Sequence, residues 1–321
     1  MNTTVVGVPR GRDEREYLPV VVGVDGSGPG LRAVDRAADE AALRGVDLRV
    51  VYASLWERYE GKALADALGG PADEVLGEKV VQVAVRRARD RRPALRVSAG
   101  TVPEEPGYVL VRESRNACLL VLGSRGRGAL TEALLGSVAL TVAGHAHCPL
   151  IVVRGDDHDT RSRPRILVGV GEPFAGSAAV RFAVDEARRR GAVLEAVRAW
   201  RHPARGGPDL ARPDEESAHR CERRAWEALE EALRGVPAGM EVRRRVVEGS
   251  ARTVLVDAAH GAGLLVVGAR RRPRTFGLQL GRVAHRALHH ADCPVAVVPE
   301  RDDGQSVGQR LGQSFAAWSG T

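Results

Sequence analysis

The stretch Leu119-Leu-Val-Leu-Gly-Ser-Arg-Gly-Arg-Gly-Ala-Leu-Thr-Glu-Ala-Leu-Leu-Gly-Ser137 decides the fold of this chain. It predicts a buried strand, a glycine-rich loop and the start of a helix. A second stretch repeats it as Leu264-Leu-Val-Val-Gly-Ala-Arg-Arg-Arg-Pro-Arg-Thr-Phe-Gly-Leu-Gln-Leu-Gly-Arg282. The second copy has Arg271 in place of Gly126 and Arg282 in place of Ser137. We therefore predict a duplicated α/β domain with one intact and one degenerate phosphate-binding loop.

The repeat extends well beyond these loops. Val-Gly-Val-Asp25 aligns with Val-Gly-Val-Gly171, and Cys148-Pro149 aligns with Cys293-Pro294. A repeat of this length indicates two domains of one fold, because solenoid repeats are far shorter. We place them at residues 18–154 (half one) and 164–299 (half two), joined by the polar linker 155–164. Residues 1–17 and 300–321 lack apolar periodicity, and we expect them to be flexible tails.

Both halves alternate apolar strand-length runs with helical patterns. In half one we expect strands near 20–24, 48–53, 95–99, 118–122 and 150–153, and in half two near 166–170, 193–199, 241–247, 264–267 and 295–298. This alternation predicts, in each half, a five-stranded parallel sheet covered by helices on both faces. With strand order 3-2-1-4-5, strands one and four are neighbours where the winding direction reverses, which is where such sheets bind ligands. Asp25 and Gly123, which end these two strands, should therefore face one crevice.

The glycine loop of half one has the features that a phosphate site requires. Glycine lets the backbone approach a phosphate closely, and the following helix offers free N–H groups and a favourable dipole. Ser137 fits either as the helix N-cap or as a hydroxyl donor to a phosphate oxygen, and Arg125 and Arg127 offer charge-assisted contacts. The alternative is a loop that is merely flexible. Neither the P-loop pattern nor the dinucleotide fingerprint is present; Leu31 stands where the latter needs a glycine.

Composition excludes several other functions. The 48 Lys and Arg residues exceed the 41 Asp and Glu residues, which gives a net charge of +7. A solvated arginine surface accounts for this excess. The absence of a helix-turn-helix pattern, of zinc-finger spacing and of many aromatics argues against nucleic-acid binding. The histidines and cysteines near the end of each copy fit a helix-to-strand turn better than a metal site. They are His145, His147, Cys148, His285, His289, His290 and Cys293.

No signal peptide or membrane-length apolar run occurs, so we expect a cytoplasmic protein without membrane contact.

Three motifs that occur in order in half one resemble those of the universal stress protein family. They are Val-Gly-Val-Asp25-Gly-Ser, the loop Gly123-x2-Gly126-x9-Gly136-Ser137, and the closing stretch from His145 to Val153. Related stretches recur in half two, so the chain resembles a tandem member of this family.

The resemblance implies an adenine nucleotide, ATP, bound with Mg²⁺ in half one. Asp25 would lie near the nucleotide and its metal, and the backbone around Val51 would reach the adenine. Ribose and phosphates would contact the loop and the helix start, represented here by Gly123, Gly126, Gly136, Ser137 and Val138. Family members usually pair through their last strands, so we expect the two halves to pair about a pseudo-twofold axis. A homodimer is a further possibility that the resemblance leaves open.

Half two departs from the family pattern, since Gly171 replaces the aspartate and Arg271 replaces a loop glycine. We expect it to bind ATP weakly or not at all, although Arg270, Arg271, Arg272 and Arg274 could attract an anion by charge alone. The leading hypothesis for the whole chain is a stress-response or regulatory protein that binds ATP and an unidentified partner protein. The alternatives are slow ATP hydrolysis or phosphotransfer, and a scaffold that works without nucleotide.

Overall fold

The structure is a computed structural model that describes residues 17–54, 72–126, 135–154, 165–171, 177–201, 215–270 and 280–300. The predicted linker 155–164 and the tails 1–16 and 301–321 lie outside these residues. Arg127, which we considered as a phosphate contact, and the arginines of half two at positions 271, 272 and 274 also lie outside them.

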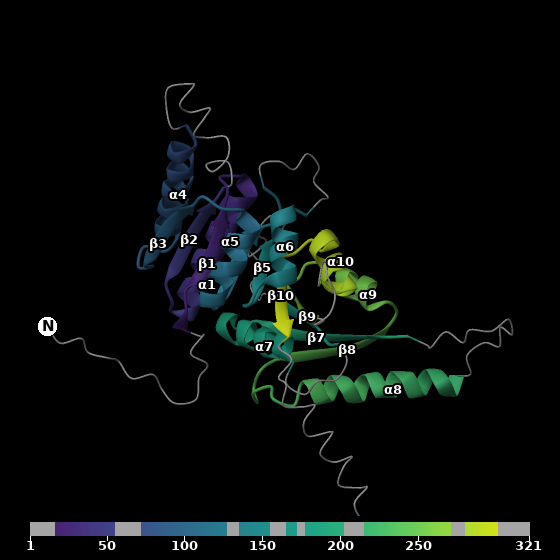
Figure 1. The fold of residues 1–321 in the computed structure, drawn as a ribbon. Helices are drawn as coiled ribbons and strands as arrows, with labels where there is room; N and C mark the ends of the chain where they lie inside the picture. The colour runs from purple at the N-terminus through teal and green to yellow at the C-terminus, as the bar shows by residue number, and fades with distance from the viewer. Residues whose placement is uncertain are drawn as a thin grey trace, which may run out of the picture.

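Each half contains five strands and the helices that connect them (Figure 1). Half one comprises β1 (Val20–Val24), α1 (Gly28–Arg44), β2 (Leu48–Ala53), α4 (Ala72–Arg91), β3 (Val97–Val102), α5 (Pro106–Glu113), η2 (Ser114–Asn116), β4 (Leu119–Gly123), α6 (Ser137–His145) and β5 (Leu150–Val153). Half two comprises β6 (Arg165–Gly169), α7 (Ala178–Arg190), β7 (Val193–Trp200), α8 (Glu215–Ala232), β8 (Val242–Glu248), α9 (Ala251–Ala258), β9 (Leu264–Arg270), α10 (Arg282–His290) and β10 (Val295–Glu300).

The strands of both halves join in one ten-stranded sheet. Its order is β3-β2-β1-β4-β5-β10-β9-β6-β7-β8, so each half has the predicted order 3-2-1-4-5. All pairs within a half are parallel, whereas β5 and β10 pair antiparallel with Val152 opposite Val295. The predicted fold class and the pairing of the halves through their last strands are therefore confirmed.

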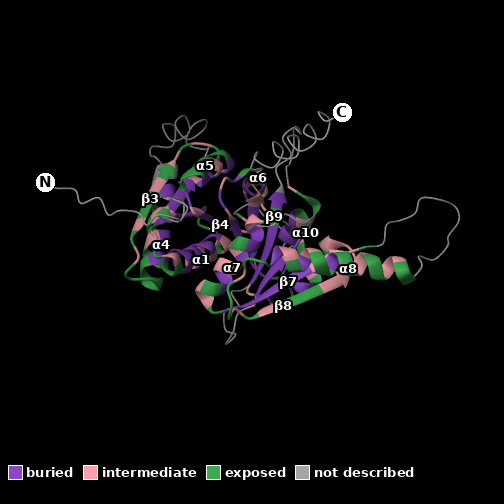
Figure 2. Ribbon diagram, turned by 90° about the horizontal axis from the view of Figure 1, so that it is seen from below, coloured by how far each residue is buried: buried purple, intermediate pink, exposed green. Residues whose placement is uncertain are grey.

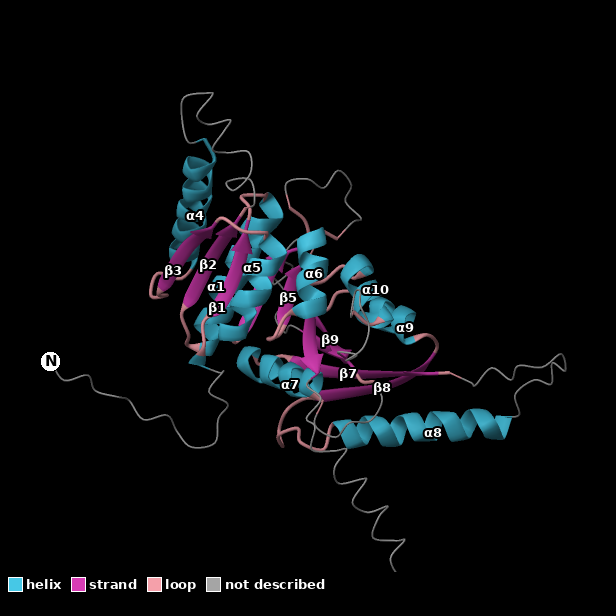
Figure 3. Ribbon diagram, in the orientation of Figure 1, coloured by secondary structure: helices cyan, strands magenta, loops and turns pink. Residues whose placement is uncertain are grey.

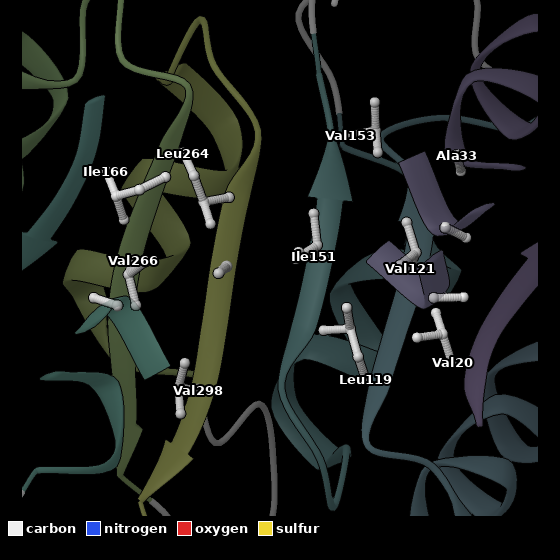
Figure 4. Close-up of a cluster of buried hydrophobic side chains, with 14 of the residues drawn as sticks. Val20, Ala33, Leu119, Val121, Ile151, Val153, Ile166, Leu264, Val266 and Val298 are labelled. Carbon is white, nitrogen blue, oxygen red and sulfur yellow. The ribbon is translucent and has the colours of Figure 1, made fainter. Parts of the chain in front are cut away.

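Within the described residues, four α-helices cover each face of this sheet. On one face, α1, α4, α7 and α8 pack over a core that includes Val20, Leu119, Ile151 and Ile166. On the other face, α5 packs beside α6 and α9 beside α10, as Figure 3 shows. Figure 2 shows the buried residues following the strands, and Figure 4 shows side chains of both halves within the first of these cores. Because each core contains residues of both halves, apolar burial continues across the β5–β10 junction.

The helix ends follow signals that are visible in the sequence. Ser27 is the N-cap of α1, and its Oγ accepts a hydrogen bond from the Gly30 N–H at 3.1 Å. Gly45 and Gly191 end α1 and α7 in the left-handed conformation, with φ of 67° and 59°. Two strand predictions were wrong by a few residues. The third strand of half one is Val97–Val102, later than the expected 95–99, and the fourth strand of half two is Leu264–Arg270, longer than the expected 264–267.

A buried ionic cluster joins α1 to α7 where the halves meet. Glu40 and Glu186 are almost completely inaccessible, and both Arg44 and Arg190 pair with both of them. Arg36 adds a third cation, with its Nε 2.8 Å from Glu40 Oε1. Burial raises the pKa of Glu40, but Arg36, Arg44 and Arg190 lower it by more, to about 2. The cluster therefore holds an ionised carboxylate in the dry contact between the halves.

The structure also tests the expectations about disulfides, metal clusters and membrane-spanning helices. All four cysteines are free thiols, and Cys148 and Cys293 are buried in the apolar layers. Within the described ranges, no three His, Cys, Asp or Glu side chains are arranged to hold a metal ion. No helix of those ranges combines the length and the apolar character that a bilayer crossing needs.

Candidate nucleotide site

A cavity of about 710 Å³ lies at the carboxyl ends of β1 and β4. These strands are neighbours with Val20 opposite Leu119, so Asp25 after β1 and Gly123 at the end of β4 reach the same edge of the sheet. Apart from Arg127, which lies outside the described residues, the residues that we predicted from the sequence all line this one cavity: Asp25, Val51, Gly123, Arg125, Gly126, Gly136, Ser137 and Val138.

Asp25 is held by the start of α1. Its Oδ1 accepts hydrogen bonds from the Ser27 N–H at 3.0 Å and from the Ser27 hydroxyl at 2.6 Å. Sequence reasoning did not assign Ser27 this role, although a Ser before Gly-Pro-Gly is a recognisable helix start. Ser27 thus links the carboxylate to the α1 N-terminus.

Gly123 permits α1 to approach β4. A Cβ atom at this position would lie 2.7 Å from the carbonyl carbon of Pro29 and 3.0 Å from the Gly30 nitrogen. These are backbone atoms of the first turn of α1, so any larger residue would push the helix away from the sheet. The glycine is therefore required by close packing beside the cavity.

Gly126 has a similar steric role toward Asp25. A Cβ on Gly126 would lie 2.7 Å from Asp25 Oδ2. In half two the counterpart of Gly126 is Arg271 and the counterpart of Asp25 is Gly171. The two substitutions of half two are therefore related. Because Gly171 has no carboxylate, position 271 has no such neighbour that would require a glycine there.

The second part of the loop returns to the end of β4. The Gly136 N–H donates to the Ser124 carbonyl oxygen at 2.9 Å and so places the start of α6 beside Arg125. Gly136 is the N-cap of α6 and supplies no side-chain cap, and Ser137 is the first helical residue. The N-cap alternative for Ser137 is therefore wrong, while its hydroxyl remains exposed at the cavity. An uncapped helix N-terminus is suited to an anion.

The opposite wall of the cavity is apolar. Val51 and Ala53 come from β2, and Pro106 and Leu110 come from α5. Val51 was predicted only from the family resemblance, and the α5 residues were not predicted because nothing in the sequence distinguishes them from ordinary core residues. The site thus combines an apolar wall with a polar end that carries Asp25, Arg125 and the α6 N-terminus.

The corresponding region of half two encloses only about 160 Å³. It is lined by Gly171, Gly268 and Val283, which are the counterparts of Asp25, Gly123 and Val138. It also contains Glu300, the last residue of β10, which the sequence had assigned to the tail. The two halves therefore share a fold but differ in the volume of the cavity at the carboxyl ends of their first and fourth strands.

Comparison with known proteins agrees with these observations. The model of the universal stress protein family matches residues 16–154 and 163–299. A universal stress protein of Mycobacterium tuberculosis is 34% identical over 295 residues, covering 88% of this chain and 97% of its own length. One from Mycolicibacterium smegmatis is 31% identical over 304 residues with the same coverage.

The fold is also found among solved structures. A universal stress protein from Archaeoglobus fulgidus matches with a TM-score of 0.61 and 18% identity, covering 89% of this chain and 99% of that one. At this identity the match concerns the fold alone. The two matches to the family model and the relatives that are covered over 97% of their length show that this chain belongs to the universal stress protein family as a tandem, two-domain member.

Proposed function

We propose that half one binds ATP with Mg²⁺ and that nucleotide occupancy regulates the binding of a partner protein. The observation that carries this proposal is that the eight predicted site residues within the described part of the chain line one cavity of about 710 Å³. That volume falls within the range of roughly 300–1,000 Å³ that is usual for small-molecule sites. The corresponding cavity of half two, with about 160 Å³, falls below this range.

The two ends of the cavity suit the two ends of a nucleotide. The apolar wall formed by Val51, Ala53 and Leu110 would accept the adenine. The loop glycines and the α6 N-terminus would bind the phosphates through backbone N–H groups, assisted by Arg125 and the Ser137 hydroxyl.

The residues present also fit a magnesium ion that arrives with the nucleotide. Mg²⁺ in such sites is held by one or two carboxylates together with phosphates and water. Asp25 is the acidic side chain among the described lining residues, and its Oδ2 faces Gly126 in the loop while Ser27 occupies Oδ1. Asp25 would thus contribute the protein's carboxylate, and the metal would neutralise phosphate charge.

Hydrolysis of the nucleotide is the weaker alternative. Attack on a phosphate needs a positioned water or acceptor. Among the described lining residues, Asp25 is the sole group able to act as a base, and Ser27 donates two hydrogen bonds to its Oδ1. We therefore favour a binding and regulatory role over a catalytic one.

Calorimetric titration of ATP, with and without Mg²⁺, tests this function. The wild type should bind one ATP per chain, and Gly126→Arg, which brings a side chain against Asp25, should abolish binding. The matched control is Gly281→Arg in half two, where a Cβ would meet no atom within 4 Å; this variant should bind as the wild type does. An absence of binding by the wild type would favour the nucleotide-independent scaffold.

A further inference from the structure

Glu300 ends β10 with its side chain at the N-terminus of α7. The Ser177 hydroxyl donates to Glu300 Oε1 at 2.7 Å, the Ala178 N–H donates to Oε2 at 3.1 Å, and the Ala179 N–H donates to Oε1 at 3.4 Å. Ser177 is the N-cap of α7 but makes no capping bond with its own side chain. A carboxylate from a distant strand therefore satisfies the first donors of this helix.

This carboxylate lies in the half-two counterpart of the nucleotide cavity. Glu300 lines the cavity of about 160 Å³ together with Gly268, which corresponds to Gly123 of half one. A Cβ on Gly268 would lie 3.1 Å from Glu300 Oε1, whereas a Cβ on Gly123 would meet the backbone of α1. The described neighbours of Gly268 are therefore the side chains of Glu300 and Ala179, whereas those of Gly123 are backbone atoms of α1.

The contacts of Glu300 are those of a bound anion. Two backbone N–H groups and a hydroxyl at a helix N-terminus are the donors that bind phosphates and carboxylates, and the helix dipole favours the negative charge. The repeat aligns Glu300 with Gly155, so half one has no acidic residue at this position of the sequence. The carboxylate is thus a feature of half two.

We propose that Glu300 is a built-in ligand of half two, which occupies the anion position at the α7 N-terminus and keeps phosphate-bearing ligands from that position. The carboxylate both occupies the space and repels a second negative charge. The further conclusion that each chain binds one nucleotide rests on the proposed function of half one. The occupancy of half two by Glu300 does not depend on it.

Thermal unfolding in sodium phosphate, compared with sodium chloride of equal ionic strength and without nucleotide, tests this proposal. Glu300→Ala should lower the midpoint in chloride by about 3 °C, as expected for the loss of a charged helix cap. Phosphate should restore much of this loss, because the ion can take the vacated position. The wild type should show no comparable gain.

Glu248→Ala is the matched control. Glu248 also ends a strand of half two, and no hydrogen bond or ion pair of its carboxylate occurs within the described part of the chain. The control loses the same charge, so it corrects for general attraction of phosphate to a basic protein. An equal phosphate response of Glu300→Ala and Glu248→Ala would overturn the proposal, as would an unchanged midpoint of Glu300→Ala in chloride.

Glu300→Gln keeps the test decisive if Glu300→Ala does not fold. It retains the size of the side chain and removes its charge, so its midpoint in chloride should fall below that of Glu248→Gln. Equal midpoints for these two variants would overturn the proposal. Because these measurements use no nucleotide, their failure is distinguishable from failure of ATP binding in half one.

Discussion

Replacing Glu40 by Gln should strongly destabilise the fold, because Glu40 is the centre of the ionic cluster between α1 and α7. The Glu40 carboxylate is fully buried and pairs with Arg36, Arg44 and Arg190. Glutamine keeps the shape but not the charge. It would leave three buried arginines with Glu186 as the remaining anion of the cluster.

The magnitude follows from the pKa of Glu40. A carboxyl whose pKa falls from 4.5 to about 2 on folding stabilises the folded state by roughly 3 kcal/mol at neutral pH, at about 1.4 kcal/mol per pH unit. Measurements on other proteins give a similar cost, roughly 3–5 kcal/mol, for removing one partner of a buried ion pair. We therefore expect Glu40→Gln to lose about 3 kcal/mol at pH 7.

The pH dependence has a definite direction. Because the pKa of Glu40 is lowered on folding, its stabilisation is complete above pH 4.5 and is lost as the pH falls toward about 2. Glu186 acts in the opposite sense, since burial and the charge of Glu40 raise its pKa. Protonation of Glu40 should therefore lower the stability of the wild type as the pH falls from 4.5 toward 2.

Urea unfolding followed by circular dichroism measures both effects. The control is Glu104→Gln, because Glu104 pairs with Arg112 at the surface and such pairs contribute about 0–1 kcal/mol. If Glu40→Gln were no less stable than Glu104→Gln at pH 7, the assignment of a charged, stabilising cluster would be refuted.

Three further predictions concern other parts of the chain. Ser27→Ala should cost about 1 kcal/mol in urea unfolding through loss of the α1 cap, and should weaken ATP binding in calorimetry because Asp25 loses a donor; unchanged values would contradict both roles. Cys118 and Cys293, whose pKa values burial raises to about 11 and about 12, should resist iodoacetamide at pH 8 in the native protein; mass spectrometry showing fast labelling would refute this. ADP formation by the wild type should not exceed that by Asp25→Ala, and a clear excess in a coupled assay would favour the enzymatic alternative.

Much of the fold could be predicted because its signals are local and occur twice. Apolar runs such as Val20–Val24 and Leu119–Gly123 form strands buried on both faces, and Gly45 ends its helix as a left-handed cap. The third strand of half one was misplaced because β3 lies at the edge of the sheet, and its half-exposed residues give a weak pattern.

Long-range contacts were not predictable from the sequence. Glu300 looked like part of a polar tail, and its role depends on Ser177, which is remote in sequence. The pairing of Arg44 with Glu186 likewise depends on how the halves meet. For the candidate site, the loop glycines and Asp25 were recognisable as a motif, whereas Ser27 and the apolar wall from α5 became evident only in three dimensions.

The most direct test of the central claim is calorimetric titration of ATP and Mg²⁺ into the wild type, Gly126→Arg and Gly281→Arg. We predict one ATP per chain for the wild type and for Gly281→Arg, and no binding for Gly126→Arg. Two sites per chain, or binding that survives Gly126→Arg, would contradict the assignment of the nucleotide to half one.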